Sequence, residues 1–317
     1  MKIAFLFPGQ GSQSVGMGQA FAQASPAAAA VWRKADEALD FPLSRLCFEG
    51  PEEDLALTAN TQPAILTASV AAAAVLAERG IRPDLCAGHS LGEYSALVVT
   101  GALGFVDAVR LVRKRGEFMQ EAVPVGTGAM AALMGLDLAA AEQACAESAQ
   151  GEVVNVANIN SPGQIVIAGN RGAVERAVKA AAALGGRKSV LLPVSAPFHS
   201  ALMKPAADRL AAELERLTAH APRVPVARNA DAGLTTTAED VKPFLVRQVA
   251  SPVRWADCLR TLAREGATAW LEVGPGRVLT GLLKRTIEGA RGHPVEDPDS
   301  LEKAAAALAA AAGDPPA

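Results

Sequence analysis

The amino-acid sequence predicts an α/β fold in which a mostly parallel sheet carries an inserted ferredoxin-like unit. Two observations support this prediction. Strand-like and helix-like segments alternate along most of the 317 residues, which is typical of a parallel sheet covered by helices. Between residues 124 and 195 the order becomes strand–helix–strand–strand–helix–strand, the order of a ferredoxin-like unit. Residues 1–123 and 196–317 are therefore expected to form one discontinuous large subdomain, and residues 124–195 a small one.

The chain is expected to begin with a buried strand, KIAFLF, followed by the glycine-rich turn PGQGSQ. In the helix expected at residues 61–80, Thr61 is the N-cap, Pro63 lies in the first turn and Gly80 marks the end. Apolar periodicity and turn residues predict this order: strand 2–7, helices 26–39 and 61–80, strand 84–88, helices 91–99 and 105–122.

In the inserted unit, two strands lie back to back across the turn NSPG. Its expected elements are strand 128–136, helix 139–149, strands 152–159 and 164–169, helix 173–185 and strand 188–194. The α/β pattern then resumes with a helix that Ser200 caps and Pro205 kinks. The expected elements here are helix 200–220, strand 225–229, helices 239–250 and 255–266, strand 267–273, helix 277–289, and a surface helix or frayed tail at 301–313.

Composition excludes several classes of protein. Half of the residues are apolar, a fifth are charged and the net charge is −3, so no global basic field indicates nucleic-acid binding. No charge-free apolar stretch is expected to reach membrane-spanning length, and the start is too short for a signal peptide. The four cysteines lack any Cys-x-x-Cys pair, which indicates small core residues in a reducing compartment rather than a zinc site or disulfides. We therefore expect a cytoplasmic protein.

The stretch LCAGHSLGEY holds the pattern Gly-x-Ser-x-Gly around Ser90. Between a strand and a helix this pattern is typical of a nucleophile elbow, in which glycines permit a tight turn and the hydroxyl is exposed at a helix N-terminus. A pentapeptide of this kind also arises by chance. The flanking buried strand and amphipathic helix favour the elbow and make Ser90 a candidate nucleophile.

A serine nucleophile needs a base, most often histidine. His89 is adjacent to Ser90 and points to the opposite face, His220 lies near a predicted helix C-terminus, and His293 lies in a loop. His199 follows the last strand of the inserted unit, where the chain re-enters the large subdomain and where a cleft is expected. Elimination therefore favours His199.

The remaining parts of such a site are less clear from the residues. No carboxylate between Ser90 and His199 has a persuasive setting, so either a backbone carbonyl orients the histidine or the mechanism is different. For an oxyanion hole, Leu91 supplies one N–H group as the residue after the nucleophile. The turn FPGQGSQ, with Gln10 between two glycines, supplies a second candidate, although such turns are usually structural.

These residues in these settings closely resemble the malonyl-CoA:acyl carrier protein transacylases. Eight blocks in the right order carry the resemblance, and together they cover nearly the whole chain: FPGQGSQ, TQPAILTAS, GHSLGEYSAL, RGEFMQEAVPVGTGAMAA, NINSPGQIVIAG, PFHSALM, VRQVASPVRW and EVGPGRVLTGLLKR.

The resemblance implies a hydrolase-like core with the inserted ferredoxin-like subdomain. It implies a ping-pong transfer in which Ser90 is the nucleophile and His199 the general base and acid. The backbone N–H groups of Leu91 and Gln10 would form the oxyanion hole. The donor would be malonyl-CoA and the acceptor the phosphopantetheine thiol of an acyl carrier protein, with no metal or redox cofactor, on a monomer.

The resemblance also assigns supporting residues. The backbone carbonyl of Gln248 would orient the histidine, and Asn160 would be a polar support near it, although Asn160 also suits a plain turn. Arg115, otherwise one charge on a solvated helix face, would hold the malonyl carboxylate with two parallel hydrogen bonds. Gly116 would let the ligand approach. Phe198 would crowd the methyl group of methylmalonyl, which discriminates by about 1–3 kcal/mol.

Three alternative functions of this chain stay open. The first is a serine esterase or thioesterase, which uses the same elbow. The second is a catalytically silent subunit that binds the carrier protein, and the third is a transacylase that loads a polyketide carrier. Carrier proteins are typically acidic, so a basic surface is expected to receive one; its candidates are Arg110, Arg113, Lys114, Arg187, Lys188, Lys284 and Arg285.

Overall fold

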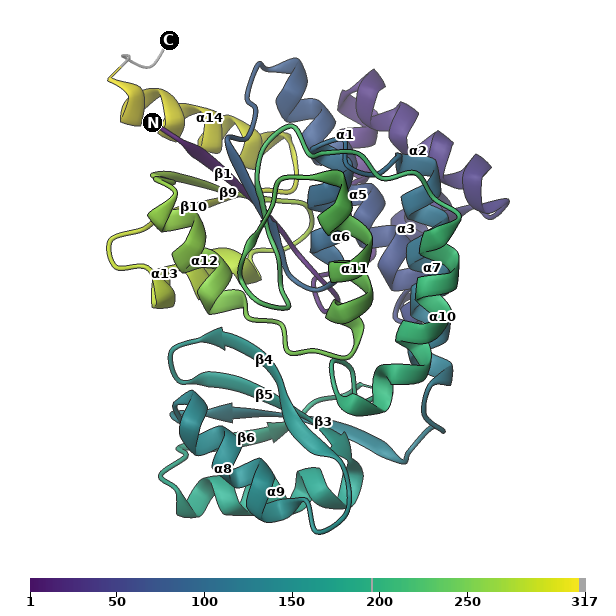
Figure 1. Ribbon diagram of the computed structural model, residues 1–317. Coiled ribbons are helices and arrows are strands. Elements are labelled where there is room, and N and C mark those ends of the chain that lie inside the picture. Colours follow the sequence, from purple (N-terminus) through teal and green to yellow (C-terminus); the bar gives the residue numbers. More distant parts are fainter. Residues whose placement is uncertain (195, 314–317) are drawn as a thin grey trace.

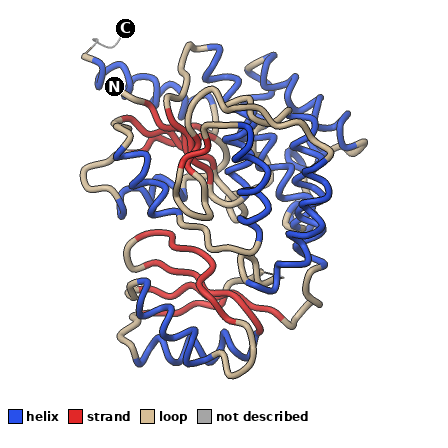
Figure 2. The backbone as a smooth tube through the Cα atoms, in the orientation of Figure 1, coloured by secondary structure: helices blue, strands red, loops and turns tan. Residues whose placement is uncertain are grey.

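The computed structural model describes residues 1–194 and 196–313. Two sheets lie in separate parts of the molecule, with most helices packed around the larger one (Figures 1 and 2). This arrangement confirms the predicted α/β fold with a mostly parallel sheet. The boundary at residues 195/196 falls on Ser195, outside the described residues, and the division into 1–123 with 196–317 and 124–195 stays a prediction.

The large sheet is parallel except at one edge. Its order is β10-β9-β1-β2-β7-β8, and only the β7–β8 pair is antiparallel. The strands are β1 (Ile3–Phe7), β2 (Leu85–Gly88), β7 (Val226–Ala227), β8 (Leu234–Thr235), β9 (Ala269–Val273) and β10 (Gly292–Val295). In register, Phe7 of β1 lies beside Gly88 of β2, so both strands end at the same edge.

Both faces of this sheet are buried, because the side chains of β1 alternate between two apolar clusters. Ala4 and Leu6 pack with the tryptophan and leucines of α12 and α13, whereas Phe5 and Phe7 pack with the other helices. The helices of this part are α1 (Gln19–Ala24), α2 (Pro26–Leu39), α3 (Leu43–Glu49), α4 (Glu52–Leu55), α5 (Thr58–Glu78), α6 (Leu91–Val99), α7 (Phe105–Glu121), α10 (Lys204–Glu215), α11 (Ala238–Val249), α12 (Trp255–Arg264), α13 (Val278–Thr286) and α14 (Pro298–Ala312).

The small sheet is antiparallel, with the order β4-β5-β3-β6 that a ferredoxin-like unit requires. Its elements are β3 (Gly128–Met134), α8 (Leu138–Ser148), β4 (Val154–Ser161), β5 (Gln164–Asn170), α9 (Arg171–Ala183) and β6 (Lys188–Leu191). Helices α8 and α9 cover one face (Figure 1). The other face contributes Met130 and Val166 to the core of the large part.

Backbone hydrogen bonds join the two parts. The N–H of Ile159 on β4 donates to the carbonyl of Val253, and the N–H of Val253 donates to the carbonyl of Ala157, both at 2.9 Å. The chain just before α12 therefore extends the edge of the small sheet at β4, which fixes the small sheet beside the large part.

Several expected elements differ from the observed ones. Helix α5 begins at Thr58, so Thr61 is not its N-cap and instead donates its hydroxyl to the Leu55 carbonyl at 2.6 Å. Helix α10 begins at Lys204, after a short 3₁₀ turn, and ends at Glu215. Pro205 therefore lies in the first turn, where proline is favoured, and does not kink the helix. His220 is thus in a loop and not near a helix C-terminus.

Near the C-terminus of the chain, His293 lies in strand β10 and not in a loop, since it pairs with Leu271 of β9. Helices α1, α3 and α4 and the short strand β8 were not expected, because each is too short to show a clear period.

The expectation that no apolar stretch reaches membrane-spanning length is wrong for α5. By length and composition this helix is long enough, but 78% of its apolar window is buried inside the protein. Its small residues allow other helices to pack around it. All four cysteines are buried and free, as expected of core residues.

Candidate active site

The turn around Ser90 connects β2 to α6 in a conformation that requires glycine on both sides. Ser90 has φ 52° and ψ −104°, in the left-handed half of conformational space. A Cβ at Gly88 would lie 1.8 Å from the carbonyl carbon of Gly92, and one at Gly92 would lie 2.0 Å from the Phe7 carbonyl oxygen. The chain therefore forms the tight strand–turn–helix of an elbow, with Ser90 directly before the first residue of α6.

Ser90 and His199 are brought together from segments 109 residues apart. The Ser90 Oγ lies 2.7 Å from Nε2 of His199, and Nδ1 of His199 lies 3.0 Å from the backbone carbonyl of Gln248. Since a carbonyl only accepts, Nδ1 carries the proton, and Nε2 is left to accept from the Ser90 hydroxyl. A backbone carbonyl thus occupies the place that a carboxylate takes in other hydrolase-like sites.

His199 is held as a neutral imidazole. Burial, followed by the positive charge of Arg115, lowers the pKa of His199 to about 3. The hydrogen bond to the Gln248 carbonyl opposes this shift but does not cancel it. At neutral pH the ring is therefore free to accept a proton from Ser90.

Arg115 is a fully buried cation with amides and a hydroxyl as its hydrogen-bond partners. It projects from α7, its guanidinium donates to Oε1 of Gln62 at 2.8 Å and to Oε1 of Gln248 at 3.0 Å, and its Nη2 lies 3.2 Å from Ser90 Oγ. It is 1% exposed, its Nε has no hydrogen bond within the described chain, and it makes no direct ion pair there. The residue is thus not on a solvated face.

Gly116 has a different role from the one expected of it. A Cβ at this position would lie 2.6 Å from the carbonyl oxygen of Thr58 and 2.8 Å from the Cα of Ala59. Gly116 therefore permits close packing of α7 against α5, which brings Gln62 within reach of Arg115. It does not provide space for a ligand.

Asn160 supports a histidine, but not His199. Its Oδ1 lies 2.9 Å from Nε2 of His89, and the His89 ring also packs against Trp255 with ring centroids 5.5 Å apart. The expectation of a polar support near the base is corrected, because the β4 edge delivers Asn160 to the histidine before Ser90. His89 lines the same cavity as Ser90 and His199, which differs from the expectation that it points to the opposite face.

Three buried polar residues hold the elbow in place: Asn229 and Glu93, which the sequence did not indicate, and Gln248, which was expected only for its backbone carbonyl. Asn229 accepts from the Ser90 N–H and donates to the Gly88 carbonyl, both at 2.7 Å. Gln248 donates from Nε2 to the Ser90 carbonyl at 2.9 Å and to Glu93 Oε2 at 2.8 Å. Burial raises the pKa of Glu93 to about 7, although its hydrogen bonds oppose the shift.

Replacing Asn229 with Ala is expected to destabilise the protein. The change leaves the Ser90 N–H and the Gly88 carbonyl unpaired in the interior, which costs about 2–4 kcal/mol of unfolding free energy. Urea denaturation measures this loss. The control is Asn60→Ala, which removes one exposed side-chain bond to the Asp54 carbonyl and is expected to cost well under 1 kcal/mol. Equal losses in the two variants would contradict a special role for Asn229 at the elbow.

A cavity of about 130 Å³ lies over Ser90. Gln10 and Leu91 line it, and within the described chain neither backbone N–H has a hydrogen-bond partner. Phe198, 8% exposed, closes one side. Its lining residues are Gln10, Gln62, His89, Ser90, Leu91, Arg115, Met119, Met130, Asn158, Leu192, Val194, Phe198 and His199.

A larger cavity of about 890 Å³ adjoins the first and shares Gln10, Leu192 and Val194 with it. The small cavity is enough for a short acyl group and too small for a whole cofactor-sized molecule. Together the two cavities form a path from the surface to Ser90. Among the described residues, no cluster of three His, Cys, Asp or Glu side chains is placed to hold a metal ion.

Comparisons with known proteins agree with this geometry. The model of the acyl transferase domain family matches residues 4–306. A malonyl CoA-acyl carrier protein transacylase of Escherichia coli is 50% identical over 304 residues, which cover 96% of this chain and 98% of that protein. An acyl carrier protein S-malonyltransferase of Vibrio cholerae has a solved structure with a TM-score of 0.94 and 48% identity, covering 96% of this chain and 99% of that one. A malonyl-transacylase solved with a type II polyketide synthase acyl carrier protein matches at 48% identity and a TM-score of 0.93, with coverages of 96% and 99%.

Proposed function

This chain belongs to the acyl transferase domain family, and on that premise we propose that it transfers a malonyl group from malonyl-CoA to the phosphopantetheine thiol of an acyl carrier protein. The reaction supplies fatty-acid synthesis in the cytoplasm. The relatives at about half identity over nearly the full length bear names of this activity, and the geometry around Ser90 supplies the groups that it needs.

The observation that carries the choice of substrate is the buried guanidinium of Arg115. Arg115 makes no direct ion pair in the described chain, and the Glu93 carboxylate that acts on its charge is reached only through Gln248. A buried charge without a direct ion pair is costly, so a site that keeps one suits an anion that arrives with the ligand. The malonyl group ends in a carboxylate, which a guanidinium binds with two parallel hydrogen bonds. Arg115 lies beside Ser90 Oγ, so it suits an acyl group whose carbonyl and carboxylate carbons are separated by a single methylene.

The proposed steps use the observed hydrogen bonds. The Ser90 Oγ attacks the thioester carbonyl while Nε2 of His199 takes its proton, and the imidazolium then protonates the departing thiolate of coenzyme A. In the second half, His199 takes the proton of the carrier thiol, the thiolate attacks the malonyl-serine ester, and the Ser90 oxygen recovers its proton. The N–H groups of Gln10 and Leu91 are proposed to hold the oxyanion in both halves.

No metal or redox cofactor enters these steps, because the serine, the imidazole and the two N–H groups provide the nucleophile, the proton carrier and the charge stabilisation.

The larger cavity suits the pantetheine arm of either substrate. Phe198 remains a proposed barrier to methylmalonyl. The protein is proposed to act as a monomer.

Charge on the surface narrows the proposed docking area for an acidic carrier protein. Lys114 pairs with Glu213 at 2.8 Å, and Arg113 lies 3.7 Å from Glu117, so these two α7 cations are neutralised. Arg285 donates to Gln164 at 2.6 Å. The candidates without such a side-chain partner in the described chain are Arg110, Arg187, Lys188 and Lys284. We favour Arg187 and Lys188 among them, because they lie at the start of β6, and β6 leads toward Leu192 and Val194 of the cavity.

The pH dependence of acylation is expected to report the charge of Arg115. With p-nitrophenyl acetate, which carries no carboxylate, the acid limb of kcat/KM should lie well below pH 6, because the pKa of His199 is lowered to about 3. Arg115→Ala removes a positive charge that disfavours the imidazolium, so the pKa of His199 rises and the limb moves to higher pH. An unmoved limb would contradict electrostatic coupling between the two side chains.

The proposed function is tested by separating transfer from hydrolysis. Purified protein is incubated with malonyl-CoA and phosphopantetheinylated acyl carrier proteins from fatty-acid and polyketide systems, and malonyl-carrier and free malonate are measured. The proposal predicts that transfer exceeds hydrolysis by orders of magnitude with at least one carrier. Hydrolysis at a similar rate without any transfer would identify a thioesterase instead.

A further inference from the structure

A further cavity, separate from the two near Ser90, lies at the opposite end of the large sheet. Its residues include Ile81 and Pro83, just before β2, and Val224, just before β7, whereas Ser90 follows the end of β2. Parallel strands begin at one edge of a sheet and end at the other, so the two cavities are separated by the length of the strands. The volume is about 380 Å³, larger than the cavity over Ser90.

The walls of this cavity are apolar and rigid. Phe5 of β1, 1% exposed, forms the floor, and α5 contributes Val70 and three alanines, Ala73, Ala74 and Ala77. The alanines leave open the space that larger side chains on this face of α5 would fill. Helix α5 and strand β1 are well-packed core elements, so the hollow is preformed.

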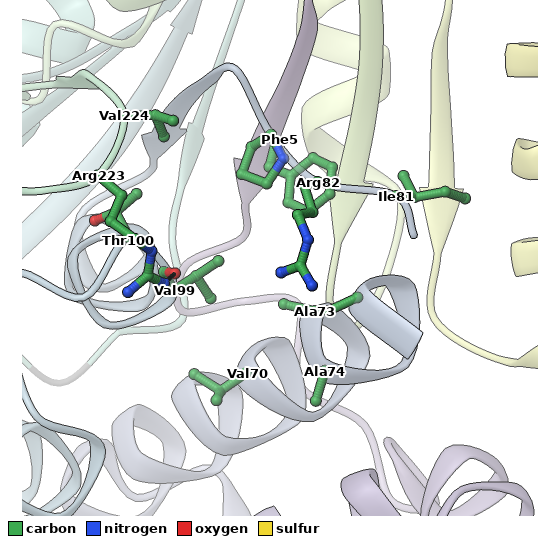
Figure 3. Close-up of a pocket in the computed structure, with 12 residues that line it drawn as sticks. Phe5, Val70, Ala73, Ala74, Ile81, Arg82, Val99, Thr100, Arg223 and Val224 are labelled. Carbon is green, nitrogen blue, oxygen red and sulfur yellow. Dashed lines mark hydrogen bonds between the residues drawn. The ribbon is translucent and has the colours of Figure 1, made fainter. Parts of the chain in front are cut away.

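Two arginines stand at the cavity, and no acidic residue lines it. Figure 3 shows the Arg82 side chain reaching toward Ala73, while Arg223 lies beside Val99 and Thr100. Arg82 makes no ion pair or side-chain hydrogen bond within the described chain. Arg223 uses one Nη to donate to the Val99 carbonyl at 2.8 Å, which leaves its other donors available. The neighbouring carboxylate, Asp84, accepts from the N–H of Ile3 at 2.7 Å.

We propose that this cavity binds an alkyl chain with one anionic head group, of the class of a medium-chain fatty carboxylate. The apolar walls of Phe5 and α5 suit a hydrocarbon chain, whose burial is favoured methylene by methylene. Arg82 and Arg223 suit a carboxylate at the mouth. A neutral amphiphile makes no charge-assisted hydrogen bond with the two arginines, and a short carboxylate does not fill the apolar part of the cavity. Tight binding therefore requires both the anionic head group and the alkyl chain.

The test measures the binding of decanoate by isothermal titration calorimetry, with decanol and butyrate as partial ligands. Decanoate is expected to bind at least about tenfold more tightly than either, because decanol lacks the charge-assisted hydrogen bond and butyrate lacks six methylene groups of the apolar chain, and each loss costs at least that much. Arg82→Ala is expected to weaken decanoate about tenfold. Ala77→Leu and, separately, Ala74→Leu are expected to abolish binding by filling the hollow. Arg33→Ala, at an exposed arginine on α2, is expected to leave it unchanged.

Other outcomes would overturn the proposal. Decanoate binding that survives both leucine variants would place the ligand elsewhere. Binding lost in Arg115→Ala but kept in the leucine variants would place it at Ser90. Decyl phosphate binding tenfold more tightly than decanoate would assign the cavity to phosphate-headed lipids rather than to carboxylates.

Discussion

Replacing Ser90 with Ala is expected to reduce malonyl transfer to the uncatalysed background. The substitution removes the hydroxyl that lies 2.7 Å from Nε2 of His199, and among the described residues that line the cavity no other side chain carries a hydroxyl. Loss of a serine nucleophile in a comparable hydrolase site costs about 10⁶-fold in kcat. The measurement is the initial rate of malonyl-carrier formation, followed over enzyme concentrations high enough to detect a residual activity.

A matched control separates chemistry from folding. Ser95 is also buried, one turn further along α6, and its Oγ has no hydrogen bond in the described chain. Ser95→Ala is expected to keep a rate within a few-fold of the parent. If Ser90→Ala retained more than about a thousandth of the parent rate while folded, another group would have to be the nucleophile.

Replacing Arg115 with Ala is expected to remove the preference for malonyl over acetyl. Loss of a buried hydrogen-bonded charge pair costs about 2–5 kcal/mol, which corresponds to a decrease in kcat/KM for malonyl-CoA of roughly 30- to 4,000-fold. Acetyl-CoA makes no use of the guanidinium, so its kcat/KM is expected to change far less. The ratio of the two kcat/KM values, measured in one assay, reports the effect directly.

Two further variants define what Arg115 contributes. Arg115→Lys keeps the charge but not the planar fork, and it is expected to recover only part of the malonyl preference. Arg110→Ala, at an exposed residue of the same helix that donates to the Ala38 carbonyl, is expected to leave the ratio unchanged. A malonyl-to-acetyl ratio in Arg115→Ala equal to that of the parent would exclude a carboxylate-binding role.

Much of the fold could be predicted from the sequence, because long elements carry strong periodic signals. Helix α2 has the predicted bounds, and in the structure its start is fixed by Ser25, which accepts from the Ala28 N–H, and by Pro26 in the first turn. The two adjacent strands of the insert indicated a hairpin, and the sheet order followed from it. The short helices and the two-residue strands β7 and β8 carried too little pattern, and their existence depends on contacts between distant segments.

The residues of the candidate site likewise divide into those that the sequence predicts and those that it does not. The local pattern around Ser90 contains the steric reason for the elbow, so it was visible in the sequence, and His199 followed by elimination. Asn229 and Glu93 gave no signal, because their partners lie more than a hundred residues away along the chain. Gln62 carries one signal in the sequence, because a polar residue in a buried helix such as α5 generally has a hydrogen-bond partner.

Two residues have a partner different from the expected one. Asn160 contacts His89, and Gly116, which is next in sequence to Arg115, contacts α5. Proximity in sequence does not determine which face a residue presents. The β4 edge and the α5–α7 packing decide these contacts, and neither was specified by the motifs.

The most direct measurement is the intact mass of the protein after brief exposure to malonyl-CoA, followed by peptide mapping and by addition of a phosphopantetheinylated acyl carrier protein. We expect one malonyl group per chain, attached to the peptide that contains Ser90, and its disappearance as the carrier protein gains the same mass. Transfer that proceeds with no adduct on the protein, or an adduct on any other residue that the carrier discharges, would contradict a malonyl-serine intermediate.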